Sequence, residues 1–175
     1  MLFFNILLHV ASLVAILLFY AKDIIILIGG FIRSVIRKKY SSDEVLTVRN
    51  LAVATIPAFI LGFFLYHHLE KLLFQPLWAC SFLVINGFIL IATKRIPQKN
   101  RQISEISLWG SLFTGLCQAF AMLPGISRSG STIAGGLVSG LRAPDAVRFS
   151  FYMAIPVNAG AGLAVRDHEV SPCLQ

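Results

Sequence analysis

Long apolar runs separated by short polar segments set the pattern of this sequence. Four of them come close to the roughly 20 residues that a helix needs to cross the hydrocarbon core of a bilayer, namely residues 3–20, 51–66, 77–93 and 149–165. A further apolar stretch, residues 24–36, continues the first run as helix. Pro57 and Pro156 fall inside two of the runs and are expected to kink them. The pattern predicts an all-α, multi-pass integral membrane protein, with a single helical domain over residues 1–165 and a polar tail over 166–175.

Two polar segments between these runs are predicted to be loops. Residues 40–47 precede the second run, and residues 67–71 contain the adjacent histidines His67 and His68. Neighbouring positions on a helix point to different faces, so such a pair does not favour a shared metal ion. A solvated interfacial loop is the better interpretation of residues 67–71. His9, the one ionisable side chain of the first run, is typical of a histidine that hydrogen-bonds to another helix.

Basic residues are concentrated in two segments that the predicted helices place on the same side of a membrane. Residues 33–39 and 94–101 each carry four Lys or Arg, whereas the connection at residues 67–75 carries one. Two spans separate the basic segments, so both obey the positive-inside rule when that side is cytoplasmic. Charged residues make up only 13% of the chain, against about a quarter in soluble domains. The net charge of +7 therefore indicates membrane topology, and no nucleic-acid partner is expected.

A shorter pair of apolar segments surrounds a polar turn. Residues 104–123 predict a helix with Ser104 as its N-cap. Small residues recur in this helix at four-residue spacing, at Ser111, Gly115 and Ala119. Such a stripe lets another helix approach closely. The segment after the turn, residues 133–141, predicts a helix too short to cross the membrane, because even eleven helical residues rise only about 16 Å. The two helices are therefore expected to form a re-entrant hairpin.

The turn itself, residues 124–132, has the composition of an anion site. Pro124 and Gly125 break the preceding helix. Three residues of the types that cap a following helix come after them: Ser129, Ser131 and Thr132. The start of a helix presents unpaired N–H groups and the positive end of the helix dipole, and Arg128 adds a planar fork of donors that suits phosphate. An arginine at this depth costs about 3 kcal/mol or more unless an anion pairs with it. The segment predicts a phosphate pocket inside the membrane.

Three stretches of the sequence resemble one known family. Residues 118–133, with their Pro-Gly-x-Ser-Arg-Ser-Gly core, resemble a signature of the bacterial undecaprenyl-diphosphate phosphatases, the bacitracin-resistance family. Residues 149–156 resemble the helix that follows this signature, and residues 5–15 resemble an early span of the family. The resemblance implies a helical membrane protein of two inverted repeats with re-entrant hairpins, in the bacterial plasma membrane. It implies hydrolysis of undecaprenyl diphosphate to the monophosphate, which recycles the lipid carrier of peptidoglycan synthesis.

The same resemblance assigns roles to residues of the turn. The catalytic set is Arg128, which would bind the diphosphate, with Ser127 and Ser129. The substrate-binding set is Gly125, Gly130, Thr132 and Gln118. Three cysteines form no spaced pair, so a structural zinc site is not indicated. No cofactor is evident, while a divalent cation stays open.

The family's other signature has two glutamates followed by a Ser-Ser-x-Gly-His turn, and this sequence does not contain it. Glu44, Glu70 and Glu105 do not reproduce it. The expectation is therefore an incomplete copy of the enzyme, with a phosphate clamp but without the carboxylates that position water or a metal ion. Two other functions stay open: a transporter or flippase for the lipid carrier, and an inert membrane fragment that only binds phosphate headgroups. The small-residue faces also allow a homo-oligomer.

Overall fold

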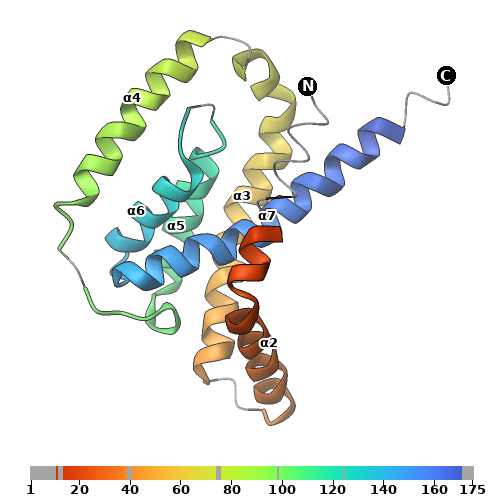
Figure 1. The fold of residues 1–175 in the computed structure, drawn as a ribbon, viewed down its shortest axis with the longest axis vertical. Coiled ribbons are helices and arrows are strands. Elements are labelled where there is room, and N and C mark those ends of the chain that lie inside the picture. The colour runs from red at the N-terminus through yellow and green to blue at the C-terminus, as the bar shows by residue number, and fades with distance from the viewer. Residues whose placement is uncertain are drawn as a thin grey trace.

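The computed structural model describes residues 11, 14–38, 41–73, 76–97, 99–123 and 125–170. Every regular element in this part of the chain is helical, which confirms the all-α prediction (Figure 1). The elements are α2 (Ala21–Ile36), α3 (Asp43–Leu73), α4 (Pro76–Thr93), the short 3₁₀ helix η1 (Ile103–Glu105), α5 (Leu108–Phe120), α6 (Arg128–Val138) and α7 (Ala143–Val170). His9, Pro124 and Cys173 lie outside the described residues, as does most of the run predicted over residues 3–20.

Three predicted boundaries were wrong, and each helix is longer than its apolar run. Helix α3 begins at Asp43, so most of the loop predicted over residues 40–47 is helical. Two acidic residues in its first turn, Asp43 and Glu44, stabilise that start by facing the positive end of the helix dipole. The predicted loop at residues 67–71 also lies inside α3, because no glycine or proline interrupts the chain there. Helix α7 continues to Val170, into the predicted tail.

Helix α3 is the centre of the fold and packs against α2, α5, α7 and η1 (Figure 1). Its closest neighbour is α5, since a Cβ atom built on Gly115 would lie only 2.1 Å from the carbonyl oxygen of Ala54. The two backbones therefore touch along the predicted small-residue stripe, all of which is buried. Asn50, fully buried on α3, donates from Nδ2 to the carbonyl oxygens of Ile103 at 2.9 Å and Ile106 at 3.2 Å. These bonds fix η1 to α3.

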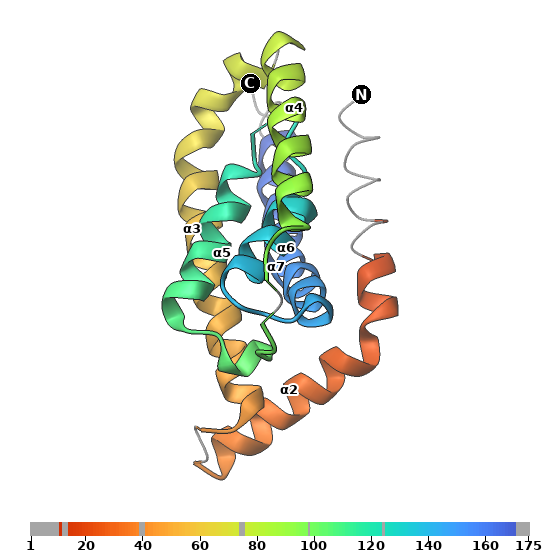
Figure 2. The same ribbon diagram turned by 90° about the vertical axis from the view of Figure 1, so that its left-hand side faces the viewer.

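Helices α5 and α6 form an antiparallel hairpin, and α7 packs against α6 (Figure 2). Near the end of α6, Ser139 Oγ donates to the carbonyl oxygen of Gly110 at 3.1 Å, early in α5. Closer to the turn, a Cβ on Gly135 would meet the Cys117 Sγ atom at 3.0 Å. Helix α5 begins with Ser107 as its N-cap, where Ser104 was predicted, because residues 103–105 form η1 first. Helices α5 and α6 are therefore antiparallel neighbours along most of their lengths.

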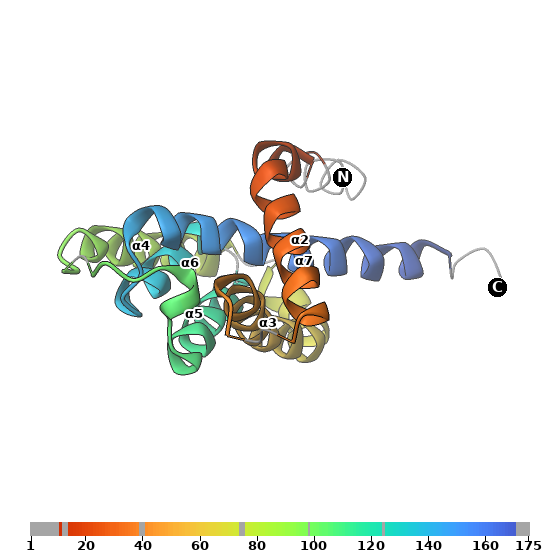
Figure 3. The same ribbon diagram turned by 90° about the horizontal axis from the view of Figure 1, so that it is seen from below.

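The outer surfaces of α2 and α4 are apolar. On α4, Leu77, Phe88 and Ile91 are each more than 60% exposed, and most other large side chains of that helix are also open. Seen from below, α7 runs across the molecule and α2 crosses it, with the Tyr20 ring 5.6 Å from that of Phe151 (Figure 3). By length and hydropathy, one segment among the described residues qualifies as a membrane span, Asp43–Leu61, and Leu77–Thr93 is a shorter apolar helix.

Candidate functional site

The turn between α5 and α6 is pressed against α4. Gly125 adopts φ +93°, a left-handed conformation that glycine accepts most readily. A Cβ atom on Gly125 would lie 2.2 Å from the carbonyl oxygen of Ala79, so any larger residue would push the turn off α4. One turn into α6, a Cβ on Gly130 would lie 2.9 Å from Leu90 Cδ2. The absence of a side chain at Gly125 and Gly130, both predicted to bind substrate, therefore allows the turn and the start of α6 to lie close to α4.

The residue that caps α6 is Ser127. Its backbone is extended, and its Oγ accepts a hydrogen bond from the Gly130 N–H at 3.2 Å. The prediction that named Ser129, Ser131 and Thr132 as cap types was wrong, because the helix already begins at Arg128. The N–H groups of Arg128 and Ser129 have no acceptor among the described residues. The start of α6 thus presents N–H groups without an acceptor in the described part of the chain, together with the positive end of the helix dipole.

Arg128 is half-buried in the first turn of α6 and forms no ion pair with any described carboxylate. Ser127 Oγ lies 3.5 Å from Ser129 Oγ, so the hydroxyls of the residues before and after Arg128 are within hydrogen-bond distance of each other. The three predicted catalytic residues are consecutive at the start of α6. A half-buried guanidinium that pairs with no described carboxylate, at a helix start, favours a phosphate oxygen as its partner.

Thr132, predicted to bind substrate, has its hydroxyl engaged within the protein. Its Oγ1 donates to the carbonyl oxygen of Arg128 at 2.9 Å and forms a short hydrogen bond with Ser150 Oγ of α7. Both side chains are buried. These contacts hold the first turn of α6 against α7, which keeps the capping geometry fixed.

Gln118 and Ser131 are buried polar side chains near the turn with unpaired atoms. Gln118 Nε2 and Ser131 Oγ have no hydrogen-bond partner among the described residues. Gly135 faces Cys117, so in the antiparallel hairpin Ser131, one turn earlier in α6, lies at the level of Gln118. Sequence reasoning named Gln118 as a binding residue and treated Ser131 only as a cap and packing residue. The sequence did contain a signal that Ser131 is buried: it stands one helical turn before Gly135 and so lies on the same face of α6, the face toward α5.

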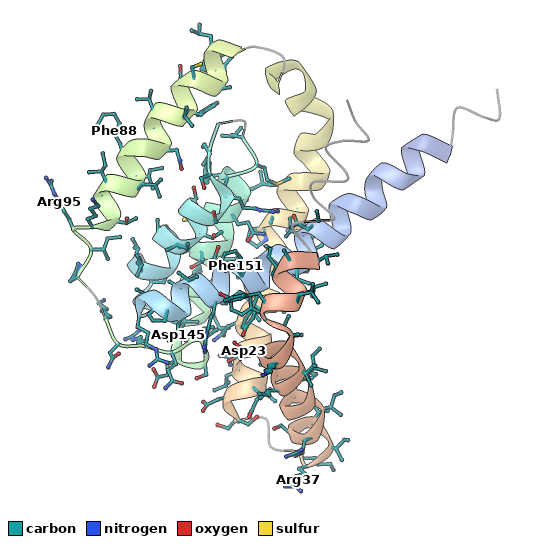
Figure 4. The ribbon with its side chains drawn as sticks, viewed as in Figure 1. Asp23, Arg37, Phe88, Arg95, Asp145 and Phe151 are labelled. Atoms are coloured by element: carbon teal, nitrogen blue, oxygen red, sulfur yellow. The ribbon has the colours of Figure 1, made fainter. Side chains whose placement is uncertain are left out.

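The described carboxylates gather at the other end of the hairpin. Asp145 pairs with Arg142 at the start of α7, and Asp23 lies 3.9 Å from Arg148 (Figure 4). Asp23, Asp43, Glu44 and Asp145 line a cavity of about 220 Å³ there. Ala146, next to Asp145, contacts Gly136 near the end of α6, so this cavity is remote from the capped start of that helix. No three His, Cys, Asp or Glu side chains within the described ranges are grouped so that they could hold a metal ion.

Comparison with known proteins identifies the family of this chain. The family model described as bacitracin resistance protein BacA matches residues 1–172. The protein named undecaprenyl-diphosphatase from Alcanivorax borkumensis is 36% identical over 160 residues, covering 91% of this chain and 60% of the relative. Proteins of the same name from Methanosphaera stadtmanae and Methanobrevibacter smithii are 38% and 39% identical, covering 91% and 90% of this chain and 62% and 60% of theirs. The chain thus spans about three-fifths of the length of these relatives. It belongs to the bacitracin resistance protein BacA family.

Proposed function

We propose that this chain carries the diphosphate-binding clamp of an enzyme that hydrolyses undecaprenyl diphosphate to undecaprenyl phosphate and inorganic phosphate. The observation that carries the proposal is the start of α6, where Arg128, which pairs with no described carboxylate, stands between Ser127 and Ser129 in sequence on a capped helix terminus. The name undecaprenyl-diphosphatase, which the relatives carry, supports the substrate class.

The clamp suits the charge of the reaction. Hydrolysis of the phosphoanhydride bond adds water across it, and negative charge is distributed over phosphoryl oxygens in the transition state. Donors that are already oriented before the reaction stabilise that charge without reorganising. In this proposal, Arg128 binds the diphosphate, while the hydroxyls of Ser127 and Ser129 and the free N–H groups of the first turn donate to its oxygens. The described residues of the clamp include no carboxylate, so the proposal assigns them no general base and routes no step through a metal ion.

The apolar outer surface supports a membrane location. Wide exposure of large side chains on α2 and α4 would be unfavourable in water, and lipid is the environment that removes the cost. We place the chain in the bacterial plasma membrane as a multi-pass protein, with α5 and α6 as a re-entrant hairpin. The ends of α2 and α4 that carry the basic segments, marked by Arg37 and Arg95, both lie away from the α3–α4 junction (Figure 4). This arrangement agrees with a common cytoplasmic side.

The test compares two arginine variants of the full chain in nanodiscs. Farnesyl diphosphate serves as the probe, and both binding and phosphate release are measured. Arg128→Ala should lower affinity about 10-fold to 150-fold, because a hydrogen bond to a charged group contributes about 1.5–3 kcal/mol. Arg37→Ala, which removes the same charge from the exposed end of α2, is the matched control and should bind like the wild type. Equal affinity of Arg128→Ala and the control would refute the proposal.

Phosphate release separates the proposed enzyme from the two other functions. Release that depends on Arg128 supports hydrolysis. Movement of a labelled prenyl diphosphate across vesicles without release would instead indicate a transporter. Tight binding with neither release nor movement would indicate a chain that only holds the headgroup.

A further inference from the structure

Helix α4 has one buried side chain among residues 77–93, and that side chain is polar. Asn86 is only 6% exposed, whereas its neighbour Ile85 is 48% exposed and Phe88 is 69% exposed. Phe88 points away from the rest of the molecule (Figure 4). Residues two apart on a helix lie on nearly opposite faces, so Asn86 is on the side of α4 that faces inward.

The contacts of two glycines place Asn86 opposite the clamp. Ala79 and Leu83 of α4 lie against Gly125, and Leu90 lies against Gly130. These three α4 positions and Asn86 form one stripe with the four-three-four spacing of a helix face. Helix α4 therefore runs alongside the segment from Gly125 to Gly130 in the same direction. Asn86 falls between Leu83 and Leu90, at the level of Ser127 and Arg128.

Asn86 lacks the partner that its burial requires. Its Oδ1 atom is buried and has no hydrogen-bond partner among the described residues. An unpaired amide in an apolar site costs free energy that a leucine on the same stripe would not, so packing does not account for it. The segment opposite is rich in donors and forms no ion pair with a described carboxylate. An anion bound there would lie between that segment and α4.

We propose that Asn86 is a further binding residue of the phosphate site, donating from its amide nitrogen to an oxygen of the bound diphosphate. The amide is nearly symmetric in shape, so rotation about its last torsion presents Nδ2 in place of Oδ1. An amide suits this position because it adds a hydrogen-bond donor and is neutral. It therefore does not compete with the bound diphosphate for the positive charge of Arg128. This inference rests on the proposed function, since it completes the same clamp from the α4 side.

The experiment measures binding of inorganic pyrophosphate and of farnesyl diphosphate to the full chain in nanodiscs. Asn86→Leu keeps the size of the side chain and removes the donor, and it should lower affinity for both probes about tenfold or more. Asn158→Leu is the matched control. Asn158 is also 6% exposed, its Oδ1 atom has no partner among the described residues, and it lies on α7 and not on the α4 stripe. The control should bind both probes like the wild type.

Asn86→Asp provides a readout that a structural role would not change. A carboxylate facing the bound phosphate repels it, so this variant should bind more weakly than Asn86→Leu at pH 7.5. The deficit relative to the wild type should shrink toward pH 4.5 as the carboxyl group becomes protonated. A deficit that does not change with pH would contradict the proposal. Far-UV circular dichroism of each variant establishes that it is folded.

Three outcomes distinguish this inference from the function on which it rests. If Arg128→Ala weakens binding and Asn86→Leu binds like Asn158→Leu, the role of Asn86 is refuted and the clamp stands. If neither Arg128→Ala nor Asn86→Leu changes affinity, the clamp itself is refuted. A loss confined to farnesyl diphosphate would place Asn86 against the prenyl chain and refute the phosphate contact.

Discussion

Replacing Gly115 by alanine should destabilise this protein although alanine is the better helix former. The new Cβ atom would lie 2.1 Å from the carbonyl oxygen of Ala54 and 2.9 Å from its carbonyl carbon. Such contacts are not found below 3.0 Å, so α3 and α5 would have to separate by about 0.9 Å at this point. Both contacting groups are backbone, and Ala54 is fully buried, so no flexible side chain can move aside.

The change in the free energy of unfolding caused by Gly115→Ala follows from two opposing effects. Forcing an extra carbon atom into a well-packed interior typically costs about 1–3 kcal/mol. Replacing glycine in a helix regains about 1 kcal/mol. Because the clash is between two backbones, we expect the upper part of the first range and a net loss of about 1–2 kcal/mol.

The assay is unfolding by sodium dodecyl sulfate in mixed micelles, followed by far-UV circular dichroism. Gly29→Ala on α2 is the matched control, because a Cβ atom there would meet nothing within 4 Å. It should raise the free energy of unfolding by about 0.5–1 kcal/mol, while Gly115→Ala lowers it. A Gly115→Ala protein as stable as the control would show that α3 and α5 are not in backbone contact, and the packing described for this seam would be wrong.

Three further predictions concern the interior and the clamp. Asn50→Leu should lower the free energy of unfolding by about 2–3 kcal/mol in the same assay, because the carbonyl groups of Ile103 and Ile106 lose their donor; a neutral result would show that these bonds are dispensable. Thr132→Val should cost about 1–2 kcal/mol by removing the bond to Ser150, whereas Thr132→Ser should retain most of the stability; equal losses would show that this bond contributes no more than the methyl group does. Inorganic pyrophosphate at 100 times its wild-type dissociation constant should stabilise the wild type by about 2.7 kcal/mol and Arg128→Ala by only about 0.3–1.4 kcal/mol, and equal stabilisation of both would place the anion elsewhere.

Local chemistry predicted the hairpin well. Proline and glycine end a helix through the backbone itself, so the position of the turn could be inferred without knowing any neighbour. The helix after the turn was predicted to be too short to cross a membrane, and α6 has eleven residues, but it begins at Arg128, inside the predicted turn, and ends at Val138, so the predicted segment 133–141 was wrong at both ends. The stripe that contains Gly115 was predicted to allow close approach, and it is where α3 and α5 touch. These features depend on residues close together in sequence.

Features that depend on distant partners could not be predicted in the same way. Four hydroxyl residues lie in or beside the turn, and only the backbone angles decide that Ser127 is the cap. The polar composition of residues 67–71 predicted a loop, whereas α3 continues through them because no glycine or proline there ends the helix. Asn86 lies in a long apolar segment, and its importance appears only once α4 is placed against Gly125 and Gly130. In a helix that is apolar on all sides, the sequence alone does not specify which face packs against the neighbouring helices.

The described ion pairs lie near the end of α6 and not near its start, and this supports the proposal that the start of α6 binds an anion. Arg142 and Arg148 are paired with Asp145 and Asp23 at the far end, so the charges there are largely neutralised within the protein. Arg128 has no such partner among the described side chains, and a carboxylate beside it would compete with the ligand for the guanidinium. Burying a charge without a partner is costly, and a bound diphosphate is the group that removes the cost. The fold thus retains an unpaired cation where the proposed reaction needs one, and neutral groups such as the Asn86 amide can surround it without neutralising its charge.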